Sequence, residues 1–389
     1  MFVEFLVNAF IKDKENITDP KVRQQYGTLG SSVGIFCNVL LFAVKFLAGV
    51  ISGSIAIMAD AMNNLSDAGS SIVTLIGFRM AGRPADMDHP YGHGRIEYLS
   101  GLFVAVAILF MGVELLKTAV EKILHPEAMT VTAFSIVILI LSIGLKFWMA
   151  HFNTIIGNRI SSEAMKATAA DSLSDCVATA AVFAGMVFTY FTGKNIDGFV
   201  GILVAAFVLK AGYEAAKDTI QPLLGAAPDP DFIIGVEDLV MKYDKVMGIH
   251  DLIVHDYGPG RLIISLHAEV SYKEDILELH EEIDAIERKL AETFHCMATI
   301  HMDPIITDDD EVIEAKKRVR ALLKEMNPGW TFHDFRMVKG KNSSNVIFDV
   351  VVLPEEIVKK DELQVEIRKK IHQTYPQYYA VVTVEQSFV

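Results

Sequence analysis

The sequence predicts a helical membrane domain followed by a soluble α+β domain, and three observations support this fold class. Of the 389 residues, 51% are hydrophobic, and the mean hydropathy is +0.34. The apolar residues are concentrated in residues 30–225, in six stretches of the length that a bilayer span needs. After residue 225, predicted helices and strands follow each other in an order that occurs twice. We therefore expect six spans and two tandem ferredoxin-like αββαβ units.

The N-terminal segment, residues 1–28, precedes the first span. Met1–Ile11 is apolar but short, and it lacks the basic start and the small-residue cleavage site of a signal peptide. We interpret residues 1–28 as a cytoplasmic or interfacial segment with an amphipathic start.

The predicted membrane domain covers residues 29–225. Its six candidate spans are Leu29–Ser52, Ile55–Met80, Ser100–Ile123, Val131–Phe152, Ala164–Thr192 and Gly198–Lys217. Basic residues accumulate on the cytoplasmic side of membrane proteins. With the N-terminus inside, the inner side has Lys12, Lys14, Lys21, Arg23, Arg79, Arg83, Arg95, Arg159 and Lys166, and the outer side has Lys117, Lys122 and Lys194. This asymmetry predicts a multi-pass protein of the cell membrane with both termini in the cytoplasm.

The charge and the cysteine content argue against several classes of protein and of metal site. The net charge of −14 lies mostly after residue 225, which argues against nucleic-acid binding. Cys37, Cys176 and Cys296 are far apart and show no CxxC spacing, so they indicate neither a disulfide framework nor a thiolate metal site. We find no nucleophile–base set and no phosphate-binding loop, and we expect no enzyme.

The soluble region begins after the Gly/Pro-rich segment 224–230. We predict one αββαβ unit at residues 226–305 and a second at 306–389. Ile249-His-Asp-Leu252 resembles Phe332-His-Asp-Phe335, and the helical segments 278–283 and 362–367 also resemble each other. These similarities indicate an internal duplication.

Two polar pairs lie inside predicted spans, Asn63 with Asp67 and Asp171 with Asp175. Residues four apart lie on one face of a helix, so each pair can point toward a shared position. Charged side chains in a membrane are costly and mark ion paths. Oxygen-only ligands favour Mn²⁺, Mg²⁺ or Ca²⁺ over Zn²⁺, which prefers nitrogen and sulfur. The alternative is that these residues only form hydrogen bonds between helices.

A second candidate metal site lies in the loop after the second span, where Asp86, His89 and His93 could converge on one ion. The alternative is a turn whose histidines form local hydrogen bonds.

A third candidate site lies in the first soluble unit and consists of His250, His267, His280, His301 and Asp303. His301 and Asp303 are two apart on a predicted strand and so face the same way, and His267 on a neighbouring strand can join them. Several imidazoles with a carboxylate form a plausible metal site.

The second soluble unit lacks this imidazole set. The repeat alignment places Asp349, Gln364, Glu385 and Ser387 opposite His267, His280, His301 and Asp303, and only His250 keeps an imidazole counterpart, His333. We expect a structural or dimer-extending copy, with a weaker oxygen-ligand site as the alternative.

Four motifs together make the chain resemble the cation diffusion facilitator family over residues 10–305. They are Ala59-Asp-Ala-Met-Asn-Asn-Leu-Ser-Asp67, Asp88-His-Pro-Tyr-Gly-His-Gly-Arg95, Asp171-Ser-Leu-Ser-Asp175 and Ile300-His-Met-Asp-Pro304. The resemblance implies a homodimeric, proton-coupled exporter of divalent metals with a cytoplasmic domain that binds metal and dimerises. It places the transport site, the loop site and a binuclear cytoplasmic site on the three residue sets above.

The Asn-Asp/Asp-Asp combination resembles the manganese-exporting branch, since zinc-transporting members usually have histidine at one or two of these positions. Many relatives have an acid near the end of the sixth span that could pair with Arg95, whereas this chain has Gln221 there, with Asp218 close by. The second soluble unit also departs from the usual pattern.

These observations predict efflux of a divalent cation, with Mn²⁺ the first candidate, from the cytoplasm in exchange for protons by alternating access. The metal would be substrate and regulatory ligand, and no prosthetic group is expected. One alternative is an exporter of Zn²⁺, Fe²⁺ or a broad range of cations. An alternative of another class is a non-transporting membrane metal sensor or scaffold.

Overall fold

The computed structural model describes residues 2–17, 19–52, 55–125, 133–192, 197–340 and 343–386. Their contacts divide the chain into two compact units. The first contains residues 1–226 and the short segment 256–261, and the second contains residues 227–255 and 262–389.

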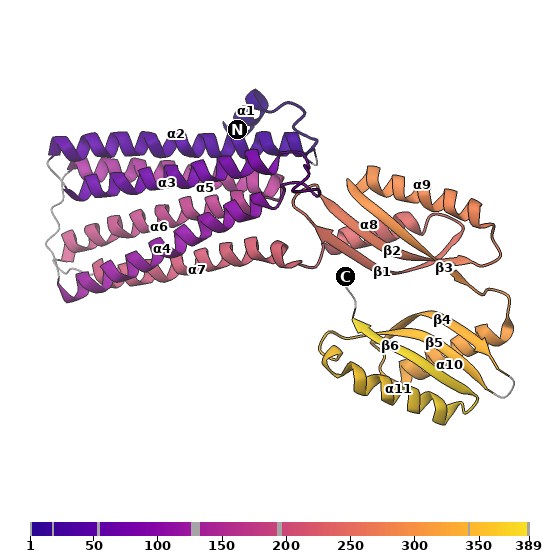
Figure 1. Cartoon of the computed structure of the whole chain (residues 1–389). Helices are drawn as coiled ribbons and strands as arrows, with labels where there is room; N and C mark the ends of the chain where they lie inside the picture. The colour runs from indigo at the N-terminus through magenta and orange to yellow at the C-terminus, as the bar shows by residue number, and fades with distance from the viewer. Residues whose placement is uncertain are drawn as a thin grey trace. The chain divides into compact units, whose positions relative to one another are not determined.

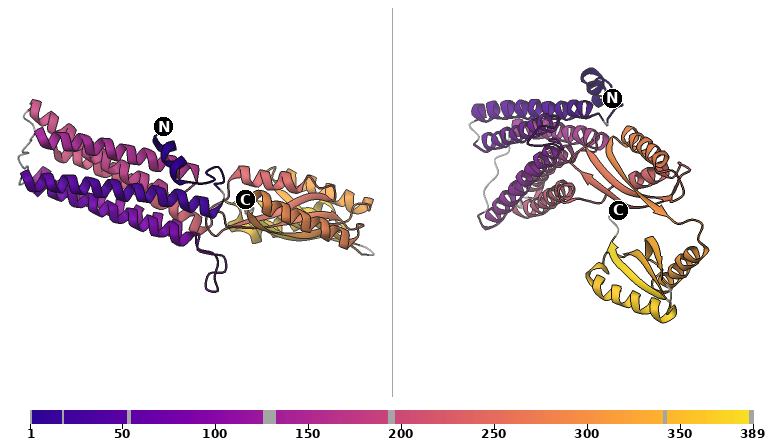
Figure 2. Two further views of the ribbon diagram at one scale, coloured as in Figure 1. Left: turned by 90° about the horizontal axis from the view of Figure 1, so that it is seen from above. Right: turned by 45° about the vertical axis from the view of Figure 1, so that its right-hand side comes forward.

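The first unit is a bundle of long helices that run side by side (Figures 1 and 2). A short helix precedes six long ones: α1 (Phe2–Phe10), α2 (Pro20–Ser52), α3 (Ile55–Ala81), α4 (Ile96–Leu124), α5 (Ala133–Arg159), α6 (Glu163–Thr192) and α7 (Asp197–Leu224). The most extensively packed pairs are α4 with α7, α2 with α3, and α5 with α6. Each of the six predicted spans corresponds to one long helix.

Four of these helices, α2, α4, α5 and α7, contain segments long and apolar enough to cross a membrane. The other two, α3 and α6, are 27 and 30 residues long and so have sufficient length. They also carry the polar pairs identified in the sequence. A polar position is tolerated at membrane depth when it faces the bundle interior.

Helix α1 packs one of its faces against the bundle. Val3, Val7 and Ile11 are buried in the hydrophobic core of the first unit, whereas Phe5 and Phe10 are 64% and 67% exposed. The buried residues recur every four positions, which places them on one helix face. An interfacial position for this helix stays a prediction.

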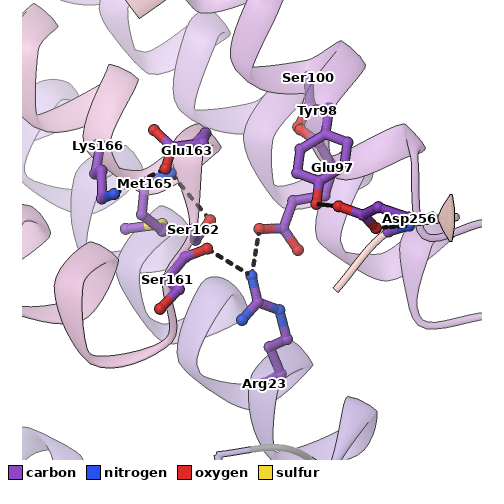
Figure 3. Close-up of polar contacts among 11 residues, drawn as sticks. Arg23, Glu97, Tyr98, Ser100, Ser161, Ser162, Glu163, Met165, Lys166 and Asp256 are labelled. Carbon is purple, nitrogen blue, oxygen red and sulfur yellow. Dashed lines mark hydrogen bonds and ion pairs between the residues drawn. The ribbon is translucent and has the colours of Figure 1, made fainter. Parts of the chain in front are cut away.

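A buried ion pair ties one end of the bundle together (Figure 3). The Arg23 guanidinium on α2 lies 2.9 Å from the Glu97 carboxylate on α4, and their side chains are 10% and 3% exposed. Arg23 also donates a hydrogen bond to the carbonyl of Ser161, between α5 and α6. A single side chain therefore links three parts of the bundle.

The turn at residues 256–261 belongs to the first unit through its polar contacts. Arg95 donates two hydrogen bonds to the carbonyl oxygen of Asp256, at 3.0 and 2.7 Å. The Tyr98 hydroxyl donates to the Asp256 carboxylate at 2.8 Å (Figure 3). Gly258 has a φ of 112°, and a Cβ there would lie 2.3 Å from the carbonyl carbon of Gly94. Glycine is thus required both by the backbone and by the close approach.

The second unit contains two three-stranded sheets. Its elements are α8 (Pro230–Val240), β1 (Val246–Asp256), β2 (Leu262–Ser271), α9 (Ile276–Phe294), β3 (Cys296–Ile305), α10 (Asp310–Met326), β4 (Thr331–Lys339), β5 (Ser344–Val352), η1 (Ile357–Lys359), α11 (Lys360–Thr374) and β6 (Tyr378–Gln386). The strand orders are β1-β2-β3 and β4-β5-β6. The order αββαβ thus occurs twice, which confirms the predicted fold class.

Each sheet has its own hydrophobic core between the strands and the helices on one face (Figure 1). In the first repeat, fully buried Leu266 on β2 packs in a cluster with Ile286 on α9. In the second, Phe348 on β5 shares a cluster with Val319 on α10. The alternating burial along β2 and β5 leaves the other sheet face free to carry polar side chains.

Candidate functional site: a buried carboxylate cluster and a histidine-rich sheet face

Three carboxylates from α3 and α6 meet inside the bundle. One ligand oxygen from each of Asp67, Asp171 and Asp175 lies within 4.8 Å of the others. Asp67 and Asp171 are 8% and 6% exposed, and the side chain of Asp175 is 16% exposed. The structure therefore brings together the three acids that the sequence spacing selected, from two helices.

Asn63, the fourth residue predicted for this cluster, lies one turn before Asp67 on α3 and is exposed. In this conformation the three acids form the buried part of the site without it.

Lys146 on α5 is the main residue of this site that sequence reasoning missed. Its ammonium nitrogen lies 2.7 Å from Asp67 Oδ2 and 2.5 Å from Asp175 Oδ2, and the residue is 4% exposed. A single lysine near the middle of an otherwise apolar span was the available signal, because such a residue faces a partner or a polar cavity. The site thus contains three potential negative charges and one positive charge.

The predicted loop site is also assembled. Asp86, His89 and His93 offer ligand atoms within 4.8 Å of one another, and each imidazole lies 3.4 Å from an Asp86 oxygen. A hydrogen bond from the backbone N–H of His89 lowers the pKa of Asp86, and the nearby histidines add to this effect. Asp86 and His89 are exposed, whereas the His93 side chain is 9% exposed. This geometry allows a metal ligand role and also allows a hydrogen-bonded turn.

The third predicted site lies on the sheet of the first repeat. His267 and His301 pair across the parallel strands β2 and β3, with ring centroids 4.7 Å apart. Asp303 accepts from His267 at 2.8 Å, lies 3.1 Å from His250 Nε2 and lies 3.3 Å from His301 Nε2. The carboxylate of Asp303 is therefore the centre of this imidazole set.

The structure does not add His280 to this group. It lies on α9 and is exposed. Instead, Asp334 on β4 offers an oxygen within 4.8 Å of the ligand atoms of His250, His267 and Asp303. Asp334 comes from the second repeat, and nothing in the local sequence around the first repeat could identify it.

The strand register corrects the alignment of the two repeats. His267 faces His301 across β2 and β3, whereas Asp349 faces Thr383 across β5 and β6. The counterpart of His301 is therefore Thr383, and the counterpart of Asp303 is Glu385, two residues earlier than the sequence alignment placed it. Similarity between the two helices does not fix the register of the strand that follows, so the error arose at β6.

The corrected register gives the second repeat a polar cluster of its own. Glu385 lies 2.7 Å from His333 Nε2, as Asp303 lies near His250 in the first repeat. Burial acts to lower the pKa of His333, but its hydrogen bond to Glu385 and the charge of Asp251 outweigh burial and raise it. Burial raises the pKa of Asp251. The second repeat therefore keeps polar side chains that could serve as metal ligands.

Comparison with known proteins assigns the chain to a family. Residues 31–224 match the cation efflux transmembrane domain, and residues 228–305 match the cytoplasmic domain of cation efflux proteins. An uncharacterized transporter of Methanocaldococcus jannaschii is 32% identical over 272 residues, which are 70% of this chain and 96% of that protein.

Two further relatives have names that state an activity. The cation-efflux pump FieF of Escherichia coli is 27% identical over 291 residues, covering 73% of this chain and 95% of the pump. The manganese efflux system protein MneS of Bacillus subtilis is 27% identical over 281 residues, covering 72% of this chain and 96% of that protein. Residues 306–389 lie beyond both matched domains. The chain belongs to the cation diffusion facilitator family, as a multi-pass membrane protein for divalent cation efflux, not an enzyme, with a cytoplasmic C-terminal domain.

Proposed function

We propose that the preferred substrate is Mn²⁺ and that it leaves the cytoplasm in exchange for protons by alternating access. The observation that carries this proposal is the cluster of Asp67, Asp171 and Asp175, which offers carboxylate oxygens only. Such hard ligands suit Mn²⁺ better than Zn²⁺. Similarity to a manganese efflux protein of Bacillus subtilis supports the same choice.

Protons would couple to transport because they compete with the metal for the same oxygens. Where the site faces a more acidic compartment, protonation of the acids weakens their hold on the cation and favours release. Asn63 would add a neutral oxygen when the helices move to the metal-bound arrangement.

Lys146 would act as the counter-ion of the metal-free site. Three carboxylates and one ammonium leave two negative charges, which a single divalent cation neutralises. Because the ammonium already occupies one oxygen of Asp67 and one of Asp175, the metal must displace it from both. This competition would keep the metal from binding very tightly. An exporter needs such moderate affinity in order to release its cargo.

The remaining metal groups would have regulatory roles. Metal at the loop group or on the histidine-rich sheet face would stabilise one conformation and so shift the population toward it. The match to the cytoplasmic domain supports a homodimer. The excess of basic residues on one side supports cytoplasmic termini in the cell membrane.

The direct test is Mn²⁺ uptake into proteoliposomes driven by a pH gradient. Asp171→Asn removes one carboxylate without changing the side-chain size, and we expect it to abolish uptake. Glu214→Gln is the matched control, because Glu214 is an exposed acid on α7 that pairs only with Lys210 among the contacts described here. Uptake by the Asp171→Asn protein at the rate of the parent would show that this cluster is not the transport site.

Metal choice is tested with Mn²⁺, Zn²⁺ and Fe²⁺ side by side. We expect the double change Asn63→His with Asp171→His to increase Zn²⁺ uptake relative to Mn²⁺, since imidazole is a preferred zinc ligand. Equal rates for all three metals in the parent would support the broad-range alternative. Metal binding without any flux would support a sensor or scaffold.

A further inference from the structure

The two repeats of the cytoplasmic unit contact each other through equivalent residues. The rings of His250 and His333 stack with centroids 4.4 Å apart and an interplanar angle of 20°. His250 Nε2 lies 3.5 Å from Asp334, and His333 Nε2 lies 3.4 Å from Asp251. Each repeat thus contributes the same His-Asp dipeptide to the other, which is the pattern of an isologous interface between two copies.

The backbone at this contact is also the same in both repeats. Asp251 and Asp334 have φ values of 51° and 55°, which is a left-handed conformation that few residues other than glycine adopt. In a regular strand, consecutive side chains point to opposite faces. The left-handed residue interrupts this alternation, so that adjacent His and Asp side chains can both reach the neighbouring repeat.

Ligand atoms at the interface form three overlapping groups, and within each group they lie within 4.8 Å of one another. The first group is His250, His267 and Asp303 with Asp334 contributed by the second repeat, the second is His333 and Asp349 with Asp334, and the third is His333 and His250 with Asp251. Glu385 is hydrogen-bonded to His333 but belongs to none of these groups. By the corrected register, His333, Asp349 and Glu385 are the counterparts of His250, His267 and Asp303.

The buried histidines are not satisfied by hydrogen bonds. The side chains of His250 and His333 are 7% and 9% exposed. Among the described residues, neither ring nitrogen of His250 has a hydrogen-bond partner of acceptable geometry, and Nδ1 of His333 also lacks one. Buried polar atoms without partners are rare, and ring nitrogens in this state are free to bind a metal ion.

The spacing of the ligand atoms fits a shared ion. His250 Nε2 lies 3.1 Å from Asp303 Oδ2 and 3.5 Å from Asp334 Oδ1, although neither contact has hydrogen-bond geometry. Two ligand atoms that are each about 2.1 Å from a tetrahedral ion lie about 3.4 Å apart. The nitrogen and the two oxygens are therefore placed as co-ligands rather than as donor and acceptors.

We propose that residues 306–389 act as an internal partner of the first repeat, and that the two repeats together build a two-centre site for divalent transition metals. Asp334 completes the centre of His250, His267 and Asp303. Asp251 contributes to a second centre around His333, where Asp349 is a further oxygen ligand, and such oxygen ligands favour a harder ion such as Mn²⁺. This proposal rests on the proposed regulatory role of the cytoplasmic unit, because it takes from that role the metal ligands of the first repeat.

The test measures Mn²⁺ and Zn²⁺ binding to the full-length protein in detergent by isothermal titration calorimetry, in an Asp67→Asn, Asp171→Asn background that removes binding at the membrane cluster. We expect Asp334→Asn to weaken one centre by about tenfold or more, which corresponds to at least ~1.4 kcal/mol. Asp251→Asn should weaken the other centre selectively. Asp238→Asn, an exposed acid on α8, is the control and should bind as the parent does.

Three outcomes decide the matter. Weaker binding in both interface variants, restored by Asp334→Glu at the first centre, supports the proposal, and unchanged thermal unfolding temperatures exclude a folding defect. If His267→Ala loses metal while both interface variants bind normally, the first repeat binds metal alone and the internal partner is refuted. If no variant changes binding, including His267→Ala, the proposed regulatory site itself is wrong.

The internal origin of Asp334 is tested separately. Both repeats belong to one chain, so the measured affinity should not change when the protein is diluted across the range in which its oligomers dissociate. Loss of affinity on dilution would assign Asp334 to a second copy and overturn the internal-partner proposal.

Discussion

Replacement of Lys146 by methionine is the sharpest probe of the membrane site. The substitution keeps an unbranched side chain of similar length and removes the ammonium that lies between Asp67 and Asp175. The variant should bind Mn²⁺ more tightly and be less stable without metal, because the ammonium that contacts Asp67 and Asp175 is then gone.

The size of both effects follows from the two contacts at 2.7 and 2.5 Å. At an effective dielectric constant of about 20, each contact is worth roughly 6 kcal/mol before desolvation. Taking the ions out of water offsets much of this, and breaking a buried pair by removing one partner costs about 3–5 kcal/mol. We therefore expect the metal-free variant to lose about 3 kcal/mol or more of stability. If the metal no longer has to displace the lysine, a gain of ~3 kcal/mol corresponds to roughly 100-fold in affinity.

The assay combines thermal unfolding of the purified protein in detergent, with and without Mn²⁺, and calorimetric titration of the membrane site. Lys166→Met is the matched control, since Lys166 lies 2.7 Å from Glu163 but is 42% exposed and so contributes little. If the Lys146→Met protein binds Mn²⁺ no more tightly than the parent, the lysine does not compete with the metal, and the reasoning fails.

Three further changes test the scaffold. Arg23→Met leaves the Glu97 carboxylate buried without its partner, and we expect it to lower bundle stability by about 3–5 kcal/mol in thermal unfolding; an unchanged melting temperature would contradict this. Phe348→Ala opens a cavity at a residue with 0% exposure and should cost ~3–5 kcal/mol in chemical denaturation of the cytoplasmic unit, with a result below 1 kcal/mol arguing against the described core. The hydrogen bond from Lys339 lowers the pKa of Asp309, the residue that caps α10, so its stabilisation is present above the unfolded pKa of about 4 and is lost as the pH falls further. Melting curves of Asp309→Asn should therefore show a weaker pH dependence below about pH 4 than the parent, and identical curves would contradict the role of this carboxylate.

Sequence spacing was sufficient for the three acids of the membrane site, but not for Asn63, which is exposed. The separation of Asp171 and Asp175 by four residues fixes a shared face whatever the surrounding fold. Lys146 could not be assigned in this way, because its partners lie on two other helices and depend on how the helices are rotated against each other. Its position in an apolar span was the only clue.

In the cytoplasmic unit, the alternation of residues along the strands identified fewer of the site residues. Alternation along the strands placed His301 and Asp303 on one face correctly, but it could not tell which residues of the second repeat face them. His280 was grouped with the other histidines because it lies in the same small domain and because the family resemblance includes it, and it lies exposed on α9. The contribution of Asp334 depends on a left-handed residue and on packing between repeats, neither of which the hydrophobic pattern encodes.

The lysine in the carboxylate cluster also has a consequence for the driving force of transport. In the proposed exchange, three ionised carboxylates and the lysine ammonium would leave two negative charges, which one divalent cation or two protons would neutralise equally. Exchange of one Mn²⁺ for two protons would move no net charge, so the membrane potential, worth about 2.3 kcal/mol per charge at 100 mV, would neither drive nor oppose it. Export would draw on the pH difference alone and continue in a depolarised cell.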